Sequence, residues 1–209
     1  MGLLPGMVYG LMIHSVQSAQ TLFFSIFYTP EGNDNQKKTR QQTVMRRILE
    51  EHLFQTHSHN DVKSSKQASH AEEDWLFRFG GESKSGAGGG LDHTGGILRY
   101  GAGPLFEEPK LVVWKQVDQV AYTLICDPLD NPLLANNFLT LLIHELNDHF
   151  RPRGTHRGAP PITEHYTSRP DEILGILHYL LPGGQLLFTN FQMYKFLKGQ
   201  IGLMLQQTK

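Results

Sequence analysis

Residues Lys110 to Phe150 carry the strongest secondary-structure signals in the chain and read KLVVWKQVDQVAYTLICDPLDNPLLANNFLTLLIHELNDHF. The β-branched and aromatic runs Leu111–Trp114 and Val120–Ile125 predict two strands joined by a tight connection. The Asp, Asn and Pro residues that follow indicate a turn. Leu133–Phe150 then predicts a long helix, because apolar residues recur every four positions: Leu134, Phe138, Leu142, Leu146 and Phe150. The stretch is therefore typical of a compact α/β unit with wide apolar faces.

Two more strands and a helix are predicted near the start of the chain. Met7–Ser15 and Thr21–Tyr28 are short apolar runs whose polar link suits a hairpin. Asn33 or Asp34 can cap a helix that we expect to end between His52 and Phe54. Its apolar stripe is Val44, Met45, Ile48, Leu49 and Leu53. Its basic residues are interpreted as a solvated helix face rather than a phosphate site: Lys37, Lys38, Arg40, Arg46 and Arg47.

The next segment, Gln55–Gly96, differs in composition from the rest of the chain. It is rich in Ser, His, Lys and Gly, including the run Ser83–Gly90, and this composition predicts a flexible, low-complexity insertion. An apolar island, Trp75–Phe79, interrupts it and is expected to dock on the fold itself or on a partner.

Strand and helix signals return after the insertion. Ile97–Tyr100 predicts a strand, and the proline-containing Arg151–Thr167 predicts a polar loop. A helix capped by Ser168, with Pro170 and Asp171 in its first turn, is expected to end at Pro182–Gly184. After the short apolar segment Gln185–Phe188, a terminal amphipathic helix is predicted over Phe191–Gln206. Strands joined by short links, with helices following in blocks, favour an α+β fold in which helices cover an antiparallel sheet.

Composition narrows the class of protein. The chain has 209 residues and a hydrophobic fraction of 39%, which supports one ordinary domain with a real core. Its formal charge of −1 gives no overall attraction to nucleic acid or anionic lipid. The single cysteine, Cys126, excludes a disulfide framework and fits a reducing compartment. The apolar start, Met1–Val8, has no basic residues and is interrupted by Pro5 and Gly6, so a signal peptide is not expected. No apolar run approaches the length of a membrane span.

Histidine is abundant, but its spacing does not predict a metal centre. His57, His59 and His70 lie in the insertion without a closed ligand set at zinc spacing. His144 and His149 stand five apart on the predicted helix, so they fall about 140° apart rather than on one face. Structural or catalytic zinc is therefore not expected.

The other candidate reaction centres also have simpler interpretations. The glycines in Ser83–Gly90 lack the Lys-Ser/Thr ending of a phosphate-binding loop. Cys126 lies in an apolar strand, where a buried inert thiol is expected. Asp127, Asp130 and Asn131 are interpreted as turn formers rather than calcium ligands. No catalytic, cofactor-binding or metal-binding residue is predicted, and the chain is not expected to be an enzyme.

Three segments carry a resemblance to a known family. Met7–His14, Glu108–Trp114 and the pair Ile173–Leu177 and Leu181–Phe188 resemble the first strand, fourth strand and C-terminal signature of the sigma (small) subunits of the fifth adaptor protein complex. The similarity covers roughly residues 7–16 and 107–190. These subunits are longin-type small chains of clathrin-adaptor-like complexes.

The resemblance implies a longin-like, five-stranded antiparallel sheet sandwiched by helices. It implies a sigma adaptin domain over residues 7–190, with the insertion at 55–96, and a C-terminal amphipathic helix or tail over 191–209. It also implies assembly with zeta, beta and mu subunits and action with spatacsin and spastizin. No nucleic-acid partner is predicted, because the sequence has no DNA-binding signature and no concentrated basic surface. Membrane association would then be indirect, with a cytoplasmic protein lying peripherally on late endosomes and lysosomes.

The function implied is that of a non-enzymatic structural subunit of a heterotetrameric complex in endosomal and lysosomal vesicle-mediated protein transport. The alternative is a longin-type regulatory module for a small GTPase or SNARE partner. A role in DNA double-strand break repair, with a nuclear location, is a more remote reading, since no DNA-binding motif supports it. Some adaptor small subunits help bind acidic dileucine signals. The matching region here lies around Asn131, Leu133 and Leu134. Because Pro132 interrupts this turn, no such pocket is predicted, and Leu133 and Leu134 are instead expected to pack in the core.

Overall fold

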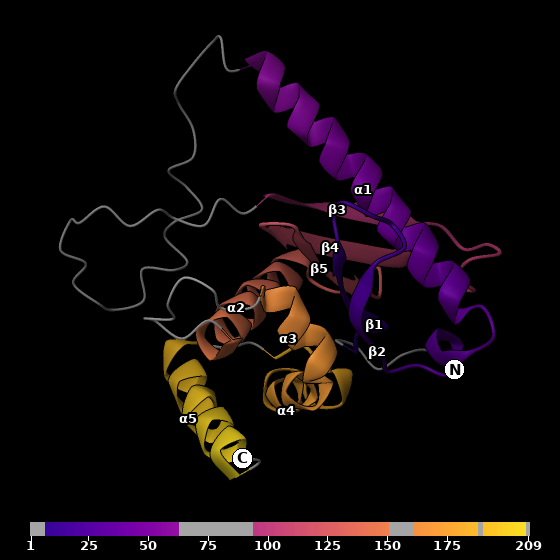
Figure 1. Cartoon of the computed structure of the whole chain (residues 1–209). Helices are drawn as coiled ribbons and strands as arrows, with labels where there is room; N and C mark the ends of the chain where they lie inside the picture. The colour runs from indigo at the N-terminus through magenta and orange to yellow at the C-terminus, as the bar shows by residue number, and fades with distance from the viewer. Residues whose placement is uncertain (1–6, 63–93, 151–160, 188–189, 208–209) are drawn as a thin grey trace.

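The computed structural model describes residues 7–62, 94–150, 161–187 and 190–207. They form one five-stranded antiparallel sheet with helices on both faces (Figure 1). The strand order is β2-β1-β5-β4-β3. The strands are β1 (Gly10–Ser15), β2 (Leu22–Phe27), β3 (Thr94–Tyr100), β4 (Lys110–Val117) and β5 (Val120–Cys126). The predicted α+β fold, with a sheet between helices, is confirmed.

The pairing of the central strands follows directly from the decisive stretch of sequence. Val117 pairs with Val120, so only Asp118 and Gln119 make the connection between β4 and β5. Asp118 has a φ of 55°, a backbone conformation that Asp tolerates better than most residues. All seven residues of β5 are buried, because β1 and β4 flank it and helices cover both its faces.

The edge strand β3 begins earlier than its sequence suggested. We predicted a strand from Ile97, but Gly95 and Gly96 already pair with Lys115 and Trp114. A Cβ atom at Gly96 would lie 3.0 Å from Nε1 of Trp114. The glycine therefore allows the indole ring to pack close to the β3 backbone. From composition alone we had predicted that Gly96 belongs to the flexible insertion.

Helix α1 (Lys37–Val62) covers one face of the sheet by itself (Figure 1). Val44, Met45 and Ile48 are at most 2% exposed, and they join a core with sheet residues that include Tyr9, Met12, Val112 and Trp114. The helix extends beyond the predicted end at His52–Phe54, and the insertion predicted from Gln55 therefore begins no earlier than residue 63. Leu53, placed in the predicted stripe, is 47% exposed.

The predicted basic face of α1 is wrong at Arg40, whose side chain is only 4% exposed. Its guanidinium donates to the Asp34 carboxylate at 2.6 and 2.8 Å and to the carbonyl oxygens of Leu105 and Glu31 at 2.6 Å. Glu31 belongs to the short helix η1 (Glu31–Asn33). Arg40 thus ties α1 both to the segment before it, at Glu31 and Asp34, and to the later segment that contains Leu105. Its hydrogen bonds to the Asp34 carboxylate lower the pKa of that carboxyl group.

The start of α1 agrees with one of the two predicted capping residues. The carboxylate of Asp34 accepts a hydrogen bond from the backbone N–H of Gln36 at 2.8 Å. The side chain of Asn33 instead donates to the carbonyl oxygens of Phe27 and Thr29. Asp34 therefore organises the entry to the helix, while Asn33 holds the preceding loop to β2.

Helix α2 (Pro132–Phe150) lies on the opposite face of the sheet and confirms the strongest helix prediction. Leu139, Leu142 and Leu146 are completely buried. Burial of each such side chain is worth roughly 1.5–3 kcal/mol, so α2 anchors the larger of the two cores. The prediction that Leu133 packs in this core is wrong, since Leu133 is 54% exposed. It precedes Leu134 in the first turn and points about 100° away from the buried stripe.

Helices α3 (Ile162–Ser168) and α4 (Pro170–Leu180) extend the covering of this face. The polar loop predicted over Arg151–Thr167 is thus wrong from residue 162 onward, while residues 151–160 lie outside the described part. The predicted cap by Ser168 is also wrong, because its hydroxyl donates to the carbonyl oxygen of Glu164 inside α3. Pro170 and Asp171 stand in the first turn of α4 as predicted.

The Pro-Gly-Gly segment ends α4 as predicted, by way of the short helix η3 (Pro182–Gly184). Gly183 and Gly184 have φ values of 59° and 85°, which side chains with a Cβ rarely adopt. The carbonyl oxygen of Gly184 accepts a hydrogen bond from the Val8 N–H at 2.8 Å. The turn therefore ties the end of α4 to the beginning of β1.

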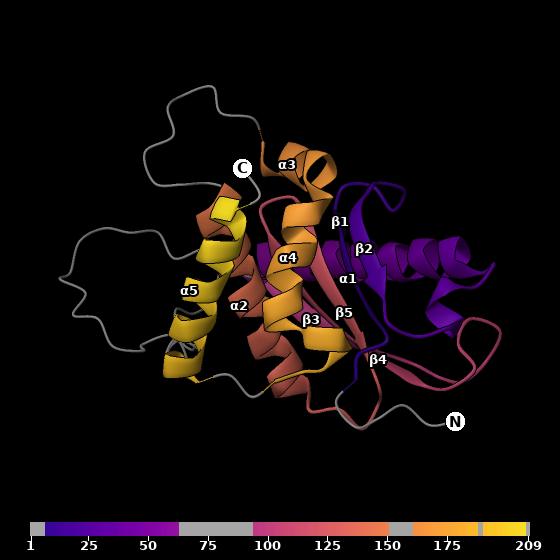
Figure 2. The same cartoon turned by 90° about the horizontal axis from the view of Figure 1, so that it is seen from below.

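The predicted terminal helix is present as α5 (Phe191–Gln207), which lies beside α4 and α2 (Figure 2). Leu197, Ile201 and Leu205 pack into the core that α2 anchors. The hydroxyl of Tyr194 also donates to Glu145 on α2 at 2.8 Å. Residues 190–207 are thus packed against the sigma-like domain predicted over 7–190.

Candidate functional site

The histidines that invited a metal hypothesis lie apart in the structure. His149 Nε2 is 2.6 Å from the Glu172 carboxylate on α4, whereas His144 Nδ1 is 3.0 Å from the Tyr194 hydroxyl on α5. His57 contacts the carbonyl oxygen of Leu53 on its own helix. Within the described residues, no three His, Cys, Asp or Glu side chains gather in a way that could hold a metal ion. The side chains of His59 and His70 lie outside that part.

Cys126 is buried at the end of β5, as predicted. Burial raises the pKa of its thiol, and the nearby carboxylates of Asp130 and Asp127 raise it further. Because the thiolate is the reactive form, this environment suppresses the nucleophilicity of the sulfur. The thiol is therefore a packing element of the larger core rather than a reaction centre.

The turn after β5 confirms the interpretation of its polar residues. Asp127 accepts a hydrogen bond from the Leu129 N–H at 3.0 Å, and Asp130 accepts one from the Asp127 N–H at 3.0 Å. Asn131 accepts one from the Leu133 N–H at 2.9 Å, at the start of α2. The oxygen atoms thus organise the backbone of the turn. The glycine run 83–90 and the apolar island 75–79 lie outside the described residues.

Exposed apolar side chains suggest where the domain can meet other proteins. Leu129 and Leu133 flank the turn before α2 and are 94% and 54% exposed. On α5, Phe196 and Leu203 are 64% and 57% exposed, on the side of the helix away from Leu197 and Ile201. Sequence periodicity alone did not identify these positions, because α2 and α5 also carry apolar residues that are buried, such as Leu139 and Leu197.

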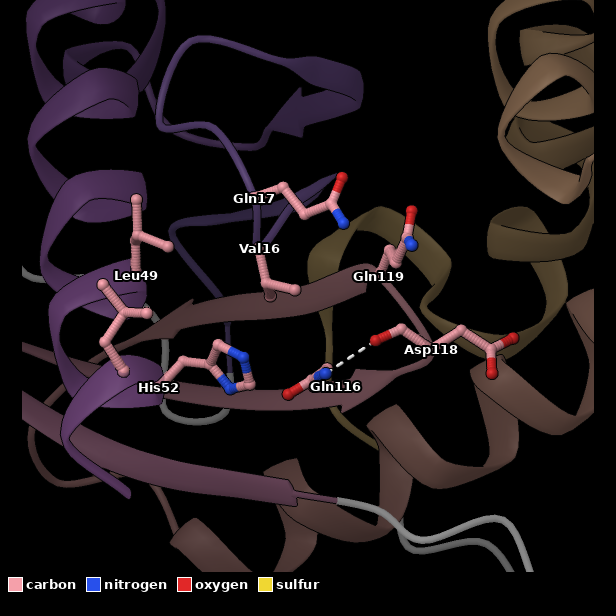
Figure 3. A pocket seen from close by; sticks show the side chains of 8 residues that line it. Val16, Gln17, Leu49, His52, Gln116, Asp118 and Gln119 are labelled. Carbon is pink, nitrogen blue, oxygen red and sulfur yellow. Dashed lines mark hydrogen bonds between the residues drawn. The ribbon is translucent and has the colours of Figure 1, made fainter. Parts of the chain in front are cut away.

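A groove of about 530 Å³ lies on the other side of the molecule, between α1 and the turn that joins β4 to β5 (Figure 3). Helix α1 contributes Leu49, His52 and Leu53. The other lining residues are Val16 and Gln17 after β1, Gln116 on β4, and Asp118 and Gln119 in the turn. Gln116 Nε2 donates to the carbonyl oxygen of Asp118 at 2.6 Å, a bond drawn in Figure 3. Burial lowers the pKa of His52, which favours its neutral imidazole. None of these residues was singled out as a site by its sequence.

Comparison with known proteins identifies the family. The model of the family described as AP-5 complex subunit sigma-1 matches residues 7–202. The chain belongs to this family. The human AP-5 complex subunit sigma-1 is 41% identical over 97 residues, a match that spans 46% of this chain and 45% of the human protein.

The fold itself is shared with a more distant solved structure. A chain of a structure titled "Homology model of the full-length AP-3 complex in a stretched open conformation" aligns with a TM-score of 0.51 and 13% identity. The alignment covers 96% of this chain and 95% of that chain. At this level of identity the likeness supports the longin-like adaptor small-subunit fold alone.

Membership of the AP-5 sigma-1 family confirms the resemblance found in the sequence. The family is one of adaptor complex subunits, which in general are not enzymes. Among the helices of the described residues, none is both long enough and apolar enough to cross a bilayer.

Proposed function

We propose that the chain is a non-enzymatic structural subunit of a heterotetrameric adaptor protein complex. The observation that carries this proposal is the match of the AP-5 sigma-1 family to residues 7–202, which includes every described strand and most of α5. The apolar side chains exposed on α5 and on the turn before α2 support it, because a subunit of a stable complex buries such side chains against its neighbours.

The partners that fit this function are the zeta, beta and mu subunits of the same complex, with spatacsin and spastizin as associated proteins. Interfaces in permanent complexes commonly bury more than about 2,000 Å². The complex would act in vesicle-mediated protein transport at late endosomes and lysosomes. This subunit would stay on the cytoplasmic side, and other subunits would supply membrane contact.

The test is affinity purification of the tagged full chain from cells, followed by mass spectrometry and size-exclusion chromatography. We expect the zeta, beta and mu subunits to co-elute with the chain in one stable peak. A monodisperse chain that elutes alone would contradict the proposal. Recovery of a small GTPase or a SNARE in place of the adaptor subunits would favour the regulatory alternative.

A further inference from the structure

The edge of the sheet at β3 differs from the opposite edge at β2. Strand β3 pairs with β4 through all seven of its residues, without a break in register. Among the described residues nothing pairs with its other side, because β3 is the last strand of the sheet. The register of β2 with β1 shifts at Ile13 and His14, and α3 lies against β2. In a regular edge strand such as β3, every second residue directs its backbone N–H and C=O groups away from the sheet.

Helix α1 crosses the face of the sheet near β3 and places an exposed aromatic side chain beside this edge (Figure 1). Gln55 Nε2 on α1 lies 3.5 Å from the position that a Cβ atom on Gly96 would take. Two turns earlier, Arg47 on α1 and Tyr100 on β3 line a common hollow. Phe54 follows Arg47 by seven positions and therefore lies on the same side of the helix. Phe54 is 69% exposed.

On the opposite face of the sheet, β3 presents an exposed apolar side chain and a cation. Leu98 and Tyr100 pack toward the core beneath α1, so the alternation along a strand directs Ile97 and Arg99 to the other face. Helix α2 packs on β4 and β5 there, and Ile97 remains 52% exposed. Arg99 is exposed and forms no ion pair with any described residue.

The charges beside the edge are predominantly positive. In the hollow next to Tyr100, Arg46 and Arg47 accompany a single acid, Glu50. Strand β3 itself contains no Asp or Glu, so two copies of this chain that paired through β3 in any register would leave both Arg99 side chains without an acidic partner. A different, acidic sequence complements this edge better than a second copy does.

We propose that the β3 edge binds an extended segment of a partner protein, which adds a strand to the sheet. The backbone groups of β3 would supply the hydrogen bonds, and the side chains on the two faces would supply the selectivity. An apolar side chain of the segment would contact Ile97, and an acidic one two positions along would pair with Arg99. Apolar side chains on the other face would contact Phe54. This inference rests on the proposed function, since the partner would be another subunit of the adaptor complex.

The first test changes the charge at the edge in the tagged full chain. Arg99 is exposed, so Arg99→Glu and Arg99→Lys leave the core untouched. We expect Arg99→Glu to lower recovery of the zeta, beta and mu subunits at least about tenfold, and Arg99→Lys to retain it. Lys38→Glu is the matched control and should also retain it, because Lys38 is exposed on the side of α1 opposite to Arg47. Equal recovery with Arg99→Glu and Arg99→Lys would overturn the proposal.

Amide hydrogen exchange tests the strand pairing directly. We expect the outward amides of β3 to exchange rapidly in the isolated chain, and at least about ten times more slowly in the purified complex. Equally fast exchange in both would refute strand addition. So would slow exchange in the isolated chain that is lost when a linker replaces residues 63–93, or a dimer of the isolated chain that Ile97→Lys dissociates. In those two cases the occupant would be the chain itself.

The same measurements separate this inference from the proposed function. If the unmodified chain recovers no adaptor subunit, the proposed function fails, and the strand-addition site fails with it. If the unmodified chain and Arg99→Glu recover the subunits equally well, only the strand-addition site is refuted, and the chain remains a subunit of the complex.

Discussion

His14 shows at the scale of one residue how burial selects a charge state. It is completely buried in β1, with Nδ1 3.1 Å from the carbonyl oxygen of Ser15 and Nε2 2.9 Å from the hydroxyl of Thr123. Because a carbonyl only accepts, Nδ1 carries the proton and Nε2 accepts from Thr123. Burial lowers the pKa of the ring to about 4, and the hydrogen bond to Ser15 partly opposes the shift.

This shift predicts a loss of stability on acidification. Between pH 6.5, the ordinary pKa, and pH 4, the unfolded chain binds a proton at His14 that the folded chain does not. The free energy of unfolding should therefore fall as the pH drops through this window, by on the order of 3 kcal/mol. We expect His14→Gln to flatten this part of the profile in urea unfolding at pH 7, 5.5 and 4.5. His178→Gln, at an exposed position, should keep the profile of the unmodified chain; an equally steep profile with His14→Gln would contradict the assignment.

Arg40 marks the limit of sequence-based prediction at this scale. Arg40 stands among other basic residues, so composition placed it on a solvated face. Its burial depends on hydrogen bonds to the carbonyl oxygens of Glu31, which precedes α1 in the sequence, and of Leu105, which follows it. Only the folded structure brings these two segments together around Arg40. The groove residues His52 and Gln116 were missed for the same reason, because they are 64 positions apart in the sequence, from 52 to 116.

At the scale of elements, strong periodicity was a reliable guide. All five strands and the helices α1, α2, α4 and α5 were predicted, because each has an apolar face that must be buried. The errors fall where no periodicity is present. The last part of α1 is polar, α3 is only seven residues long, and β3 begins with Thr-Gly-Gly, so composition favoured a loop in each case.

Helix α2 offers a comparison between an inward and an outward leucine. Leu142 is completely buried and Leu133 is 54% exposed. Leu142→Asp should unfold the isolated chain, since it places a carboxylate in the core and removes an apolar side chain whose loss costs about 2–5 kcal/mol even on replacement by alanine. Leu133→Asp should change the free energy of unfolding by no more than about 0.5 kcal/mol. Chemical denaturation followed by circular dichroism measures both, and similar losses in the two variants would show that the orientation of α2 is wrong.

At the scale of the whole molecule, one sheet separates two independent cores. Among the described helices, α1 packs on one face, while α2, α3, α4 and α5 contribute to the core on the other. The elements on either side of residues 63–93 are held by their own contacts. All seven residues of β3 pair with β4, and α1 is anchored by Val44, Met45 and Ile48.

Replacement of residues 63–93 should therefore preserve the fold. We expect a chain with a Gly/Ser linker of about 15 residues in their place to keep the same sheet, because such a linker reaches across as a flexible coil. The midpoint of thermal unfolding should stay within about 4 °C of that of the unmodified chain, which corresponds to about 1 kcal/mol for a domain of this size. The amide NMR spectrum of β4 and β5 should be retained. Loss of cooperative unfolding would mean that the replaced residues contribute to a core.

The buried position of Cys126 also has a practical consequence. It is the single cysteine of the chain, and it lies in β5, the central strand of the sheet. A maleimide reagent can reach its sulfur only when the sheet opens around it. The rate of alkylation of Cys126 therefore reports how often the sheet opens. The same protection leaves the native surface free of competing thiols. A cysteine introduced at any exposed position would therefore accept a fluorophore or crosslinker at one defined place.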